Sequence, residues 1–137
     1  MLARCLCKAI EFEFEPKHNT AINCHCSMCR QSHGAAYATQ LFASKASLRF
    51  IKGQEKLTEY PSSPMGLRVF CSVCGSRLMN YAKAHSDYMS VALAAVVDAP
   101  NIHPCANAFY ANRVQWCDPT QNLTHYDALP DDIGKYF

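Results

Sequence analysis

The spacing of nine cysteines constrains this chain of 137 residues more than any other feature of its sequence. Seven of them form three short motifs: CLC at 5–7, CHCSMC at 24–29 and CSVC at 71–74. Thiolates two or three residues apart can reach the same metal ion. The chain begins MLARCLCK, with no apolar run of signal-peptide length, so we expect a cytoplasmic protein. In that reducing compartment metal ligation is favoured over disulfides.

The first and third motifs together predict one four-thiolate zinc site. Cys5 and Cys7 are two residues apart, so on an extended segment their sulfurs point to the same side. Cys71 and Cys74 form a Cys-x-x-Cys turn followed by Gly75, and glycine accepts the positive φ that lets the backbone curl around a metal. Ordinary buried cysteines are the alternative. We expect a structural zinc that ties the N-terminal strand to a hairpin.

The middle motif is one ligand short of a closed tetrahedron. Cys24, Cys26 and Cys29 supply three thiolates, and zinc held for catalysis commonly has three protein ligands and an open position. We therefore predict an open catalytic site. The alternative is a second closed structural site, completed by one of the remaining cysteines or histidines: Cys105, Cys117, His25, His33, His85 or His103. Because His25 lies between two ligands on an extended segment, we expect its ring to point away from the metal.

Three thiolates also indicate the kind of substrate. They give a zinc site a charge of −1 and donate much electron density, so a bound water is a poorer acid than one held by neutral histidines. A soft fourth ligand such as another thiolate suits the site better, because the metal lowers the pKa of the thiol and holds the sulfur ready for attack. The middle motif therefore predicts a thiol substrate.

Strand-like periodicity predominates in the rest of the chain. In AIEFEFE, Ile10, Phe12 and Phe14 alternate with glutamates, which is the period of a half-buried strand. Further short strands are expected at 21–24, 36–42, 48–52, 56–60, 67–71 and 88–91, and one helical turn or two at 27–33. We predict a single mostly-β domain over 1–137, built of short antiparallel strands with long loops and stabilised by zinc.

Charge and hydropathy argue against several partners. The formal net charge of +2 would fall to −1 if seven thiolates held two zinc ions. The basic residues are scattered, whereas a nucleic-acid surface needs a concentrated basic face, so we expect no nucleic-acid partner. No segment approaches the ~18 apolar residues of a membrane span, so we expect no membrane partner either. The oligomeric state is not indicated.

The order CLC, CHCSMCR, RVFCSVCGS resembles the glutathione-dependent formaldehyde-activating enzyme (GFA) and centromere protein V family, and the later ANAFYANRVQW and DALP are similar to its weaker C-terminal pattern. The resemblance implies a β-tent zinc fold with two zinc ions. It implies a carbon–sulfur lyase that condenses glutathione, or a similar thiol, with formaldehyde or another small aldehyde, or cleaves the S-hydroxymethyl adduct. It places the structural ion at Cys5, Cys7, Cys71 and Cys74 and the catalytic ion at Cys24, Cys26 and Cys29.

Two arginines are candidates for contacts with a glutathione carboxylate. Arg30 follows the last cysteine of the middle motif, and Arg68 precedes the third motif. A solvated arginine is the alternative at each position. Two other functions stay open for the whole chain: a non-catalytic zinc-stabilised interaction module, and an oxidoreductase resembling methionine-R-sulfoxide reductase.

Overall fold

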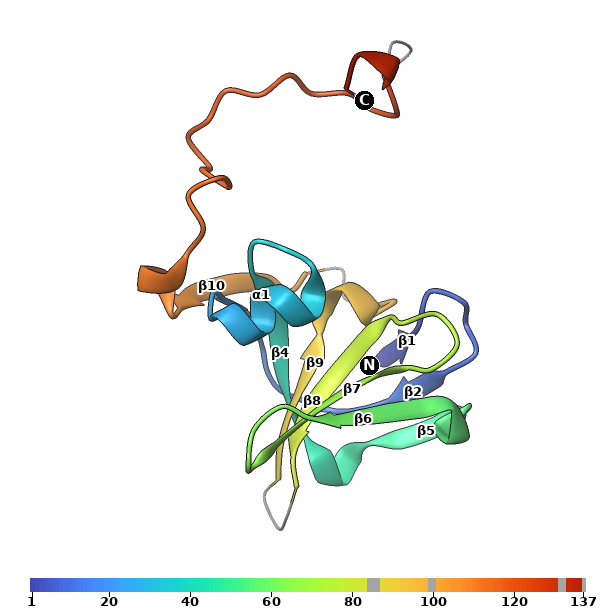
Figure 1. Cartoon of the computed structure of the whole chain (residues 1–137). Helices are drawn as coiled ribbons and strands as arrows, with labels where there is room; N and C mark the ends of the chain where they lie inside the picture. Colours follow the sequence, from blue (N-terminus) through green and yellow to red (C-terminus); the bar gives the residue numbers. More distant parts are fainter. Residues whose placement is uncertain (84–86, 99–100, 131–132, 137) are drawn as a thin grey trace.

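The computed structural model describes residues 1–83, 87–98, 101–130 and 133–136 (Figure 1). His85, one of the possible fourth zinc ligands, lies outside the described residues. The strands in chain order are β1 (Leu2–Arg4), β2 (Glu11–Glu13), β3 (Pro16–Cys24), β4 (Ala38–Ser44), β5 (Arg49–Lys52), β6 (Leu57–Pro61), β7 (Gly66–Cys71), β8 (Arg77–Ala82), β9 (Tyr88–Ala92) and β10 (His103–Ala108).

Helices are short in the described part of the chain. One α-helix, α1 (Ser27–His33), follows β3. Turns of 3-10 helix occur at η1 (Lys45–Ser47), η2 (Gln54–Lys56), η3 (Leu93–Ala95), η4 (Tyr110–Asn112) and η5 (Ile133–Tyr136). None of these described helices has the length and hydropathy needed to cross a membrane.

The strands form two sheets. The smaller sheet has the order β1-β2-β5, and the larger has the order β10-β3-β4-β9-β8-β7-β6. The pairings between named strands are antiparallel, except that β10 runs parallel to β3. The mostly-β prediction with antiparallel strands is confirmed (Figure 1). The helix predicted at 27–33 is also confirmed, with the same bounds as α1.

Alternation along the strands separates the core from the opposite face of the larger sheet. Phe12 of β2 is fully buried, as are Leu41 of β4 and Val91 of β9. Successive side chains of a strand point to opposite faces, so the sequence neighbours of Leu41 and Val91 project away from the core. Cross-strand pairing then places Arg68, Asn80, Ser90 and Phe42 in one row on that other face. Burial of the apolar side stabilises the fold, and the second side is left for a polar site.

Gly53 is required where β5 turns into η2. Its φ is +77°, and a Cβ there would overlap the carbonyl oxygen of Ala9. We expect Gly53→Ala to lower the free energy of unfolding by at least about 1–2 kcal/mol, from left-handed strain alone, with the overlap adding to that loss. Gly34→Ala is the matched control, since Gly34 has φ +59° and nothing within 4 Å of its Cβ position. Urea unfolding curves showing equal losses in both variants would contradict the role of the overlap.

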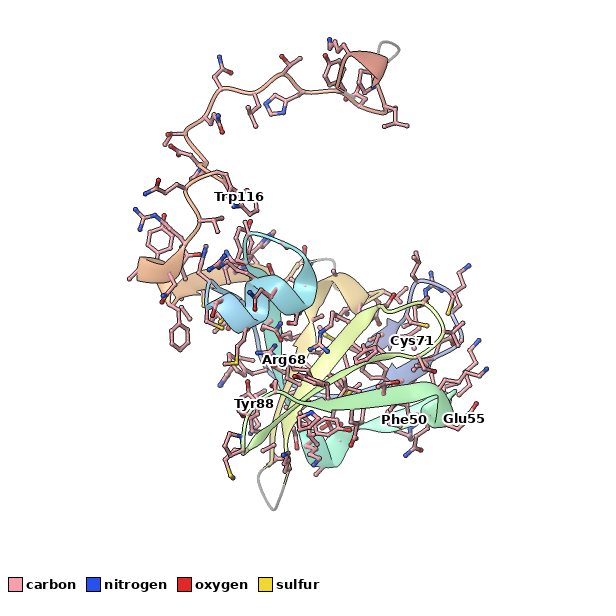
Figure 2. All side chains as sticks on the ribbon, viewed as in Figure 1. Phe50, Glu55, Arg68, Cys71, Tyr88 and Trp116 are labelled. Carbon is pink, nitrogen blue, oxygen red and sulfur yellow. The ribbon has the colours of Figure 1, made fainter. Side chains whose placement is uncertain are left out.

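The described chain after η4 leaves the body of the protein. Residues 115–129 are exposed, and the segment extends away from the sheets in Figure 1. Trp116, on this segment, has a relative exposure of 69% (Figure 2). A single domain over 1–137 therefore stays a prediction for this C-terminal part.

Candidate metal centres and thiol pocket

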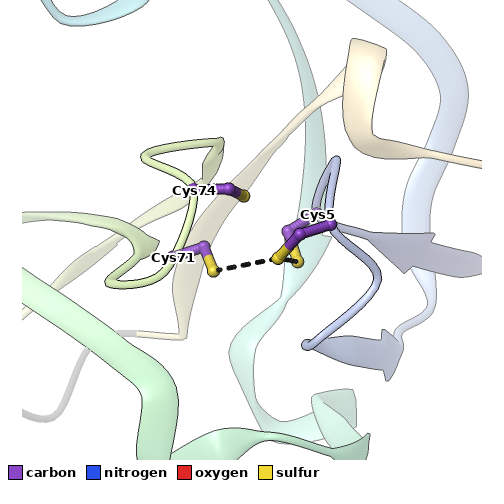
Figure 3. Close-up of side chains that lie close together, drawn as sticks. Cys5, Cys71 and Cys74 are labelled. Carbon is purple, nitrogen blue, oxygen red and sulfur yellow. Dashed lines mark hydrogen bonds between the residues drawn. The ribbon is translucent and has the colours of Figure 1, made fainter.

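The structure brings the cysteines of the first and third motifs into one cluster. The sulfurs of Cys5, Cys7, Cys71 and Cys74 all lie within 4.8 Å of one another. The Sγ atom of Cys7 is 3.5 Å from that of Cys5 and 3.9 Å from that of Cys71. Figure 3 shows Cys5 facing Cys71 and Cys74 across the space between the two segments. Four converging thiols are the donor set of a structural zinc site, so these residues fit the metal that their spacing predicts.

Local hydrogen bonds hold the two cysteine-bearing segments of the first cluster in place. Gly75 has φ +73° and donates its N–H to the Cys71 carbonyl at 2.9 Å, which closes the turn between β7 and β8. The Ser76 hydroxyl lies 3.2 Å from the Cys74 sulfur and accepts the N–H of Leu6 at 2.9 Å. Ser76 therefore links the two cysteine-bearing segments. Its hydrogen bonds lower the pKa of Cys74 to about 5, which favours the thiolate that binds metal.

The middle motif forms a second cluster where β3 passes into α1. The sulfurs of Cys24, Cys26 and Cys29 lie within 4.8 Å of one another. Cys24 ends β3, Cys26 caps α1, and Cys29 lies in its first turn. The Cys26 sulfur accepts the Cys29 N–H at 3.3 Å. The helix start therefore holds the three sulfurs together without any distant part of the chain.

The surroundings of the three thiols in the second cluster favour a bound cation. Burial, together with the adjacent sulfurs of Cys26 and Cys24, raises the pKa of Cys29 to about 12. Burial also opposes ionisation of Cys26, but hydrogen bonds from the Cys29 N–H and the neighbouring thiols outweigh it, and the pKa of Cys26 is lowered. Three thiolates this close repel one another unless a positive charge lies among them. The donor set thus fits a soft divalent metal ion.

Arg68 supplies part of that positive charge. Both terminal nitrogens of its guanidinium lie 3.9 Å from the Cys29 sulfur, and Nη1 also donates to the Ser32 hydroxyl at 3.1 Å. Arg68 belongs to β7, whereas Cys29 and Ser32 belong to α1. Figure 2 shows Arg68 below α1. The contact therefore connects the second cluster to the face of the larger sheet that lies opposite the core.

A chain of amides extends from Arg68 across that face. Asn80 Oδ1 accepts from Arg68 Nη1 at 3.4 Å and from Arg77 Nη2 at 2.6 Å. The Asn80 amide nitrogen donates to Gln40 at 3.1 Å and to Ser90 at 3.1 Å. Gln40 and Ser90 are buried. A guanidinium can only donate hydrogen bonds, so the two arginines require the oxygen of the Asn80 amide to face them. The amide nitrogen then faces Gln40 and Ser90.

The far end of this network is His33, which approaches the Gln40 amide nitrogen at 3.1 Å. Burial, with the charges of Arg77 and Arg68, lowers the pKa of His33 to about 4. At neutral pH the ring is therefore uncharged and its Nε2 accepts from the amide. Sequence reasoning assigned no role to Gln40, Asn80 or Ser32. The alternation along β4 could have placed Gln40 on the face opposite Leu41, but only the pairing register shows that Gln40 and Asn80 meet.

A cavity opens beside the second cluster. It has a volume of about 380 Å³ and is lined by Cys24, Cys29 and Arg68 together with apolar and uncharged polar side chains. The first cluster borders a separate and larger cavity of about 950 Å³. Small-molecule sites usually have volumes of about 300–1,000 Å³. The cavity beside Cys24 and Cys29 therefore has the size of a small-molecule site and gives a ligand access to this cluster.

The remaining candidate ligands lie apart from the second cluster. Cys105 and Cys117 are exposed free thiols, and neither belongs to a group of metal-binding residues in the described part of the chain. The His25 ring packs against Tyr37 and Tyr110, with centroid distances of 5.0 and 5.2 Å. Neither His25 nor His33 is grouped with the three sulfurs among the described residues. His103, in β10, is likewise outside both described groups.

Arg30 has a structural contact. Its Nε donates to the carbonyl oxygen of His25 at 3.0 Å, which fastens α1 to the end of β3. Arg30 is outside the described lining of the cavity beside Cys24 and Cys29, whereas Arg68 lines it. Contact of either arginine with a substrate carboxylate stays a prediction.

Comparison with known proteins agrees with the cysteine geometry. A crystal structure of a Rhodobacter sphaeroides protein is similar to this chain with 27% sequence identity and a TM-score of 0.62, covering 75% of this chain and 98% of that one. No curated protein matches the chain. A family model described as glutathione-dependent formaldehyde-activating enzyme matches residues 1–112, which include all the cysteines of both clusters. The chain therefore belongs to the family of glutathione-dependent formaldehyde-activating enzymes, as the order of its motifs predicts.

Proposed function

We propose that this protein is a zinc-dependent carbon–sulfur lyase that joins a thiol to formaldehyde or another small aldehyde, or cleaves the S-hydroxymethyl adduct. The observation that carries the proposal is the cluster of Cys24, Cys26 and Cys29, which has three sulfurs and opens into a cavity. Family membership supports glutathione as the thiol and formaldehyde as the aldehyde. We place the reaction in the cytoplasm, where glutathione is kept reduced.

The reaction requires no oxidant or reductant. A sulfur–carbon bond forms as the carbonyl π bond breaks, and the proton of the thiol is transferred to the carbonyl oxygen, which becomes the hydroxyl of the adduct. A zinc ion held by the three cysteines would supply a position for the thiol sulfur, lower its pKa and act as a Lewis acid. Cleavage of the adduct reverses these changes.

The residues of this chain supply positioning and charge. Cys24, Cys26 and Cys29 would hold the ion, and Arg68 offsets part of the negative charge through its contact with the Cys29 sulfur. Asn80 holds the Arg68 guanidinium from the sheet side. The apolar side chains in the lining of the cavity would lower the local polarity around a bound thiol and strengthen these electrostatic contacts.

The second ion of the proposal has a structural role. Cys5, Cys7, Cys71 and Cys74 provide four sulfurs, so zinc bound there has no open position for a substrate. Its contribution would be to join the segment after β1 to the turn between β7 and β8.

Metal content is the first test of the proposal. We expect about two zinc ions per chain after purification in reducing buffer, because the two clusters together supply a closed and an open donor set. Elemental analysis combined with quantification of free thiols checks the number. Addition of glutathione should perturb one ion only, which cobalt substitution would show as a change in the visible absorption of one site. A single ion per chain, with Cys24, Cys26 and Cys29 all open to alkylation, would contradict the catalytic assignment.

A further inference from the structure

The cavity beside Cys24 and Cys29 differs in chemistry from a site built for a multiply charged tripeptide. Arg68 is the one charged side chain among the described residues that line it. Glutathione has carboxylates at both ends and an ammonium group at one of them. No described lining residue offers a carboxylate to that ammonium. Charged groups moved from water into such a cavity without a partner lose hydration that nothing replaces.

Arg68 itself is already engaged. Its Nη1 has the Cys29 sulfur, the Ser32 hydroxyl and Asn80 Oδ1 as acceptors, and its Nη2 is also 3.9 Å from the Cys29 sulfur. Much of its hydrogen-bonding capacity is therefore used within the protein. The remaining capacity suffices for a single ligand carboxylate.

The rest of the lining is uncharged and largely apolar, although it also includes the side chains of Gln40, Ser62, Ser63, Asn80 and Ser90. Phe42 and Leu67 contribute from the sheet, and Met28 from the helix. Met65 and Phe109 lie at its edge with relative exposures of 65% and 63%. Methionine adapts its shape to an apolar ligand, and large exposed apolar side chains gathered around one cavity indicate a binding surface.

Phe109 adds an independent observation. Its φ is +54°, a left-handed conformation that strains a residue with an aromatic side chain. The ring remains largely exposed, so packing does not offset this strain. Strained backbone that packing leaves unexplained is typical of ligand sites. The conformation belongs to a residue whose exposed aromatic ring lines the cavity.

From these features we infer that the preferred thiol substrate of this protein has an apolar body and at most one carboxylate, and that it binds more tightly than glutathione with its two carboxylates and one ammonium. The inference rests on the proposed function, because the thiol sulfur would lie at the cysteine end of the cavity. Formaldehyde adds a single carbon beside that sulfur. The body of the thiol must therefore fill the remaining space, where the lining is uncharged and largely apolar.

A matched pair of thiols tests the inference on the zinc-loaded full chain. The probes are 3-mercaptopropanoate and 2-benzyl-3-mercaptopropanoate, which share the thiol and one carboxylate and differ by an apolar group. Calorimetric titration is expected to show the benzyl compound binding about tenfold tighter or more, since burying an aromatic group is favourable by that order. Glutathione is expected to bind more weakly than the benzyl compound. Zinc content measured after each titration ensures that no thiol has removed the metal.

Substitutions in the cavity test which residues give the benzyl compound its higher affinity. Met65→Ser and Phe109→Asn should each reduce the advantage of the benzyl compound several-fold, because they weaken binding of the benzyl compound more than binding of 3-mercaptopropanoate. Asparagine tolerates the left-handed conformation at position 109, so the second variant removes the ring and keeps the backbone. Ile51→Ser is the control, because Ile51 is an exposed aliphatic residue of β5, with a relative exposure of 47%, outside the described lining.

The outcomes separate this inference from the proposed function. Equal binding of the two probes, or tighter binding of glutathione than of the benzyl compound, would overturn the apolar substrate and leave zinc-dependent thiol chemistry standing. An unchanged benzyl advantage in both pocket variants would also overturn it. If none of the thiols bound the zinc-loaded chain, the proposed function would fail, and the substrate inference with it.

Discussion

Cys74→Ser is expected to leave the chain unfolded or to lower its thermal midpoint by tens of degrees. The ion proposed at this cluster joins segments 64 residues apart, as the contact of Cys7 with Cys71 shows. The apparent binding free energy of a structural zinc, roughly 10–16 kcal/mol in small metal-dependent domains, is as large as the whole stability of a typical domain. A serine hydroxyl is a much poorer zinc ligand than a thiolate. Loss of this ion would therefore be loss of the fold.

Circular dichroism melts and zinc content, measured in reducing buffer, check this expectation. Cys117→Ser is the control, since Cys117 is exposed and lies outside both described clusters. Its melting curve and its zinc content should match those of the unchanged chain. A Cys74→Ser protein that melts like the control would show that the first cluster contributes little to folding.

Cys26→Ser is expected to have the opposite profile: a folded protein that keeps about one zinc ion and loses thiol binding by at least about 100-fold. The three ligands of this cluster lie within six residues of one another in sequence, so their ion constrains the unfolded chain far less than the first ion does. The Cys26 sulfur also caps α1 by accepting the Cys29 N–H, and serine is among the preferred residues for that role. The substitution thus removes a thiolate while it retains the cap.

Side-by-side melts of Cys26→Ser and Cys74→Ser make the comparison decisive. The Cys26→Ser midpoint should fall by no more than a few degrees, and calorimetric titration with thiols should give no heat above background. Equal collapse of the two variants would mean that both clusters are structural, and the enzyme assignment would lose its physical support.

The cysteine pairing and the core could be read from local sequence. Spacings of two and three residues bring the sulfurs within each motif together, and the structure has the two groups that the motifs indicate, although the group of four also needs a contact between segments 64 residues apart. The alternation around Phe12 likewise places that ring in the core. The spacing within each cysteine motif and the alternation around Phe12 both depend on neighbours a few residues apart, which is the range over which strand and turn geometry is determined.

The edge strand β10 could not be predicted from local sequence. Its sequence, HPCANA, has no alternation, contains Pro104, and pairs with β3 in parallel through a bulge between Pro104 and Ala106. All but one of its residues are exposed, so no apolar pattern indicates it. Strand β8 was missed for a related reason, because the buried Leu78 and Met79 are adjacent and break the alternation.

The row of polar side chains formed by Arg68, Asn80 and Ser90 could not be predicted, because it depends on the register of strand pairing. Arg68 lies opposite Asn80 in the β7–β8 pairing, and Asn80 lies opposite Ser90 in the β8–β9 pairing. A shift of one residue in either pairing would send these side chains to the core face. The sequence alone leaves Arg68 as a candidate for a substrate contact, and the pairing is what brings its guanidinium to the Cys29 sulfur.

The separation of ligands along the chain also determines when each cluster can form on the ribosome. The cluster of Cys24, Cys26 and Cys29 is complete once α1 has emerged, whereas the other cluster waits for Cys74, more than forty residues later. Synthesis at about 5–20 residues per second makes that interval a matter of seconds. During it, Cys5 and Cys7 are present without their partners. We therefore expect the nascent chain to acquire the ion of the substrate site before the ion that holds the sheets together, and zinc content of ribosome-bound chains arrested before Cys71 would test this order.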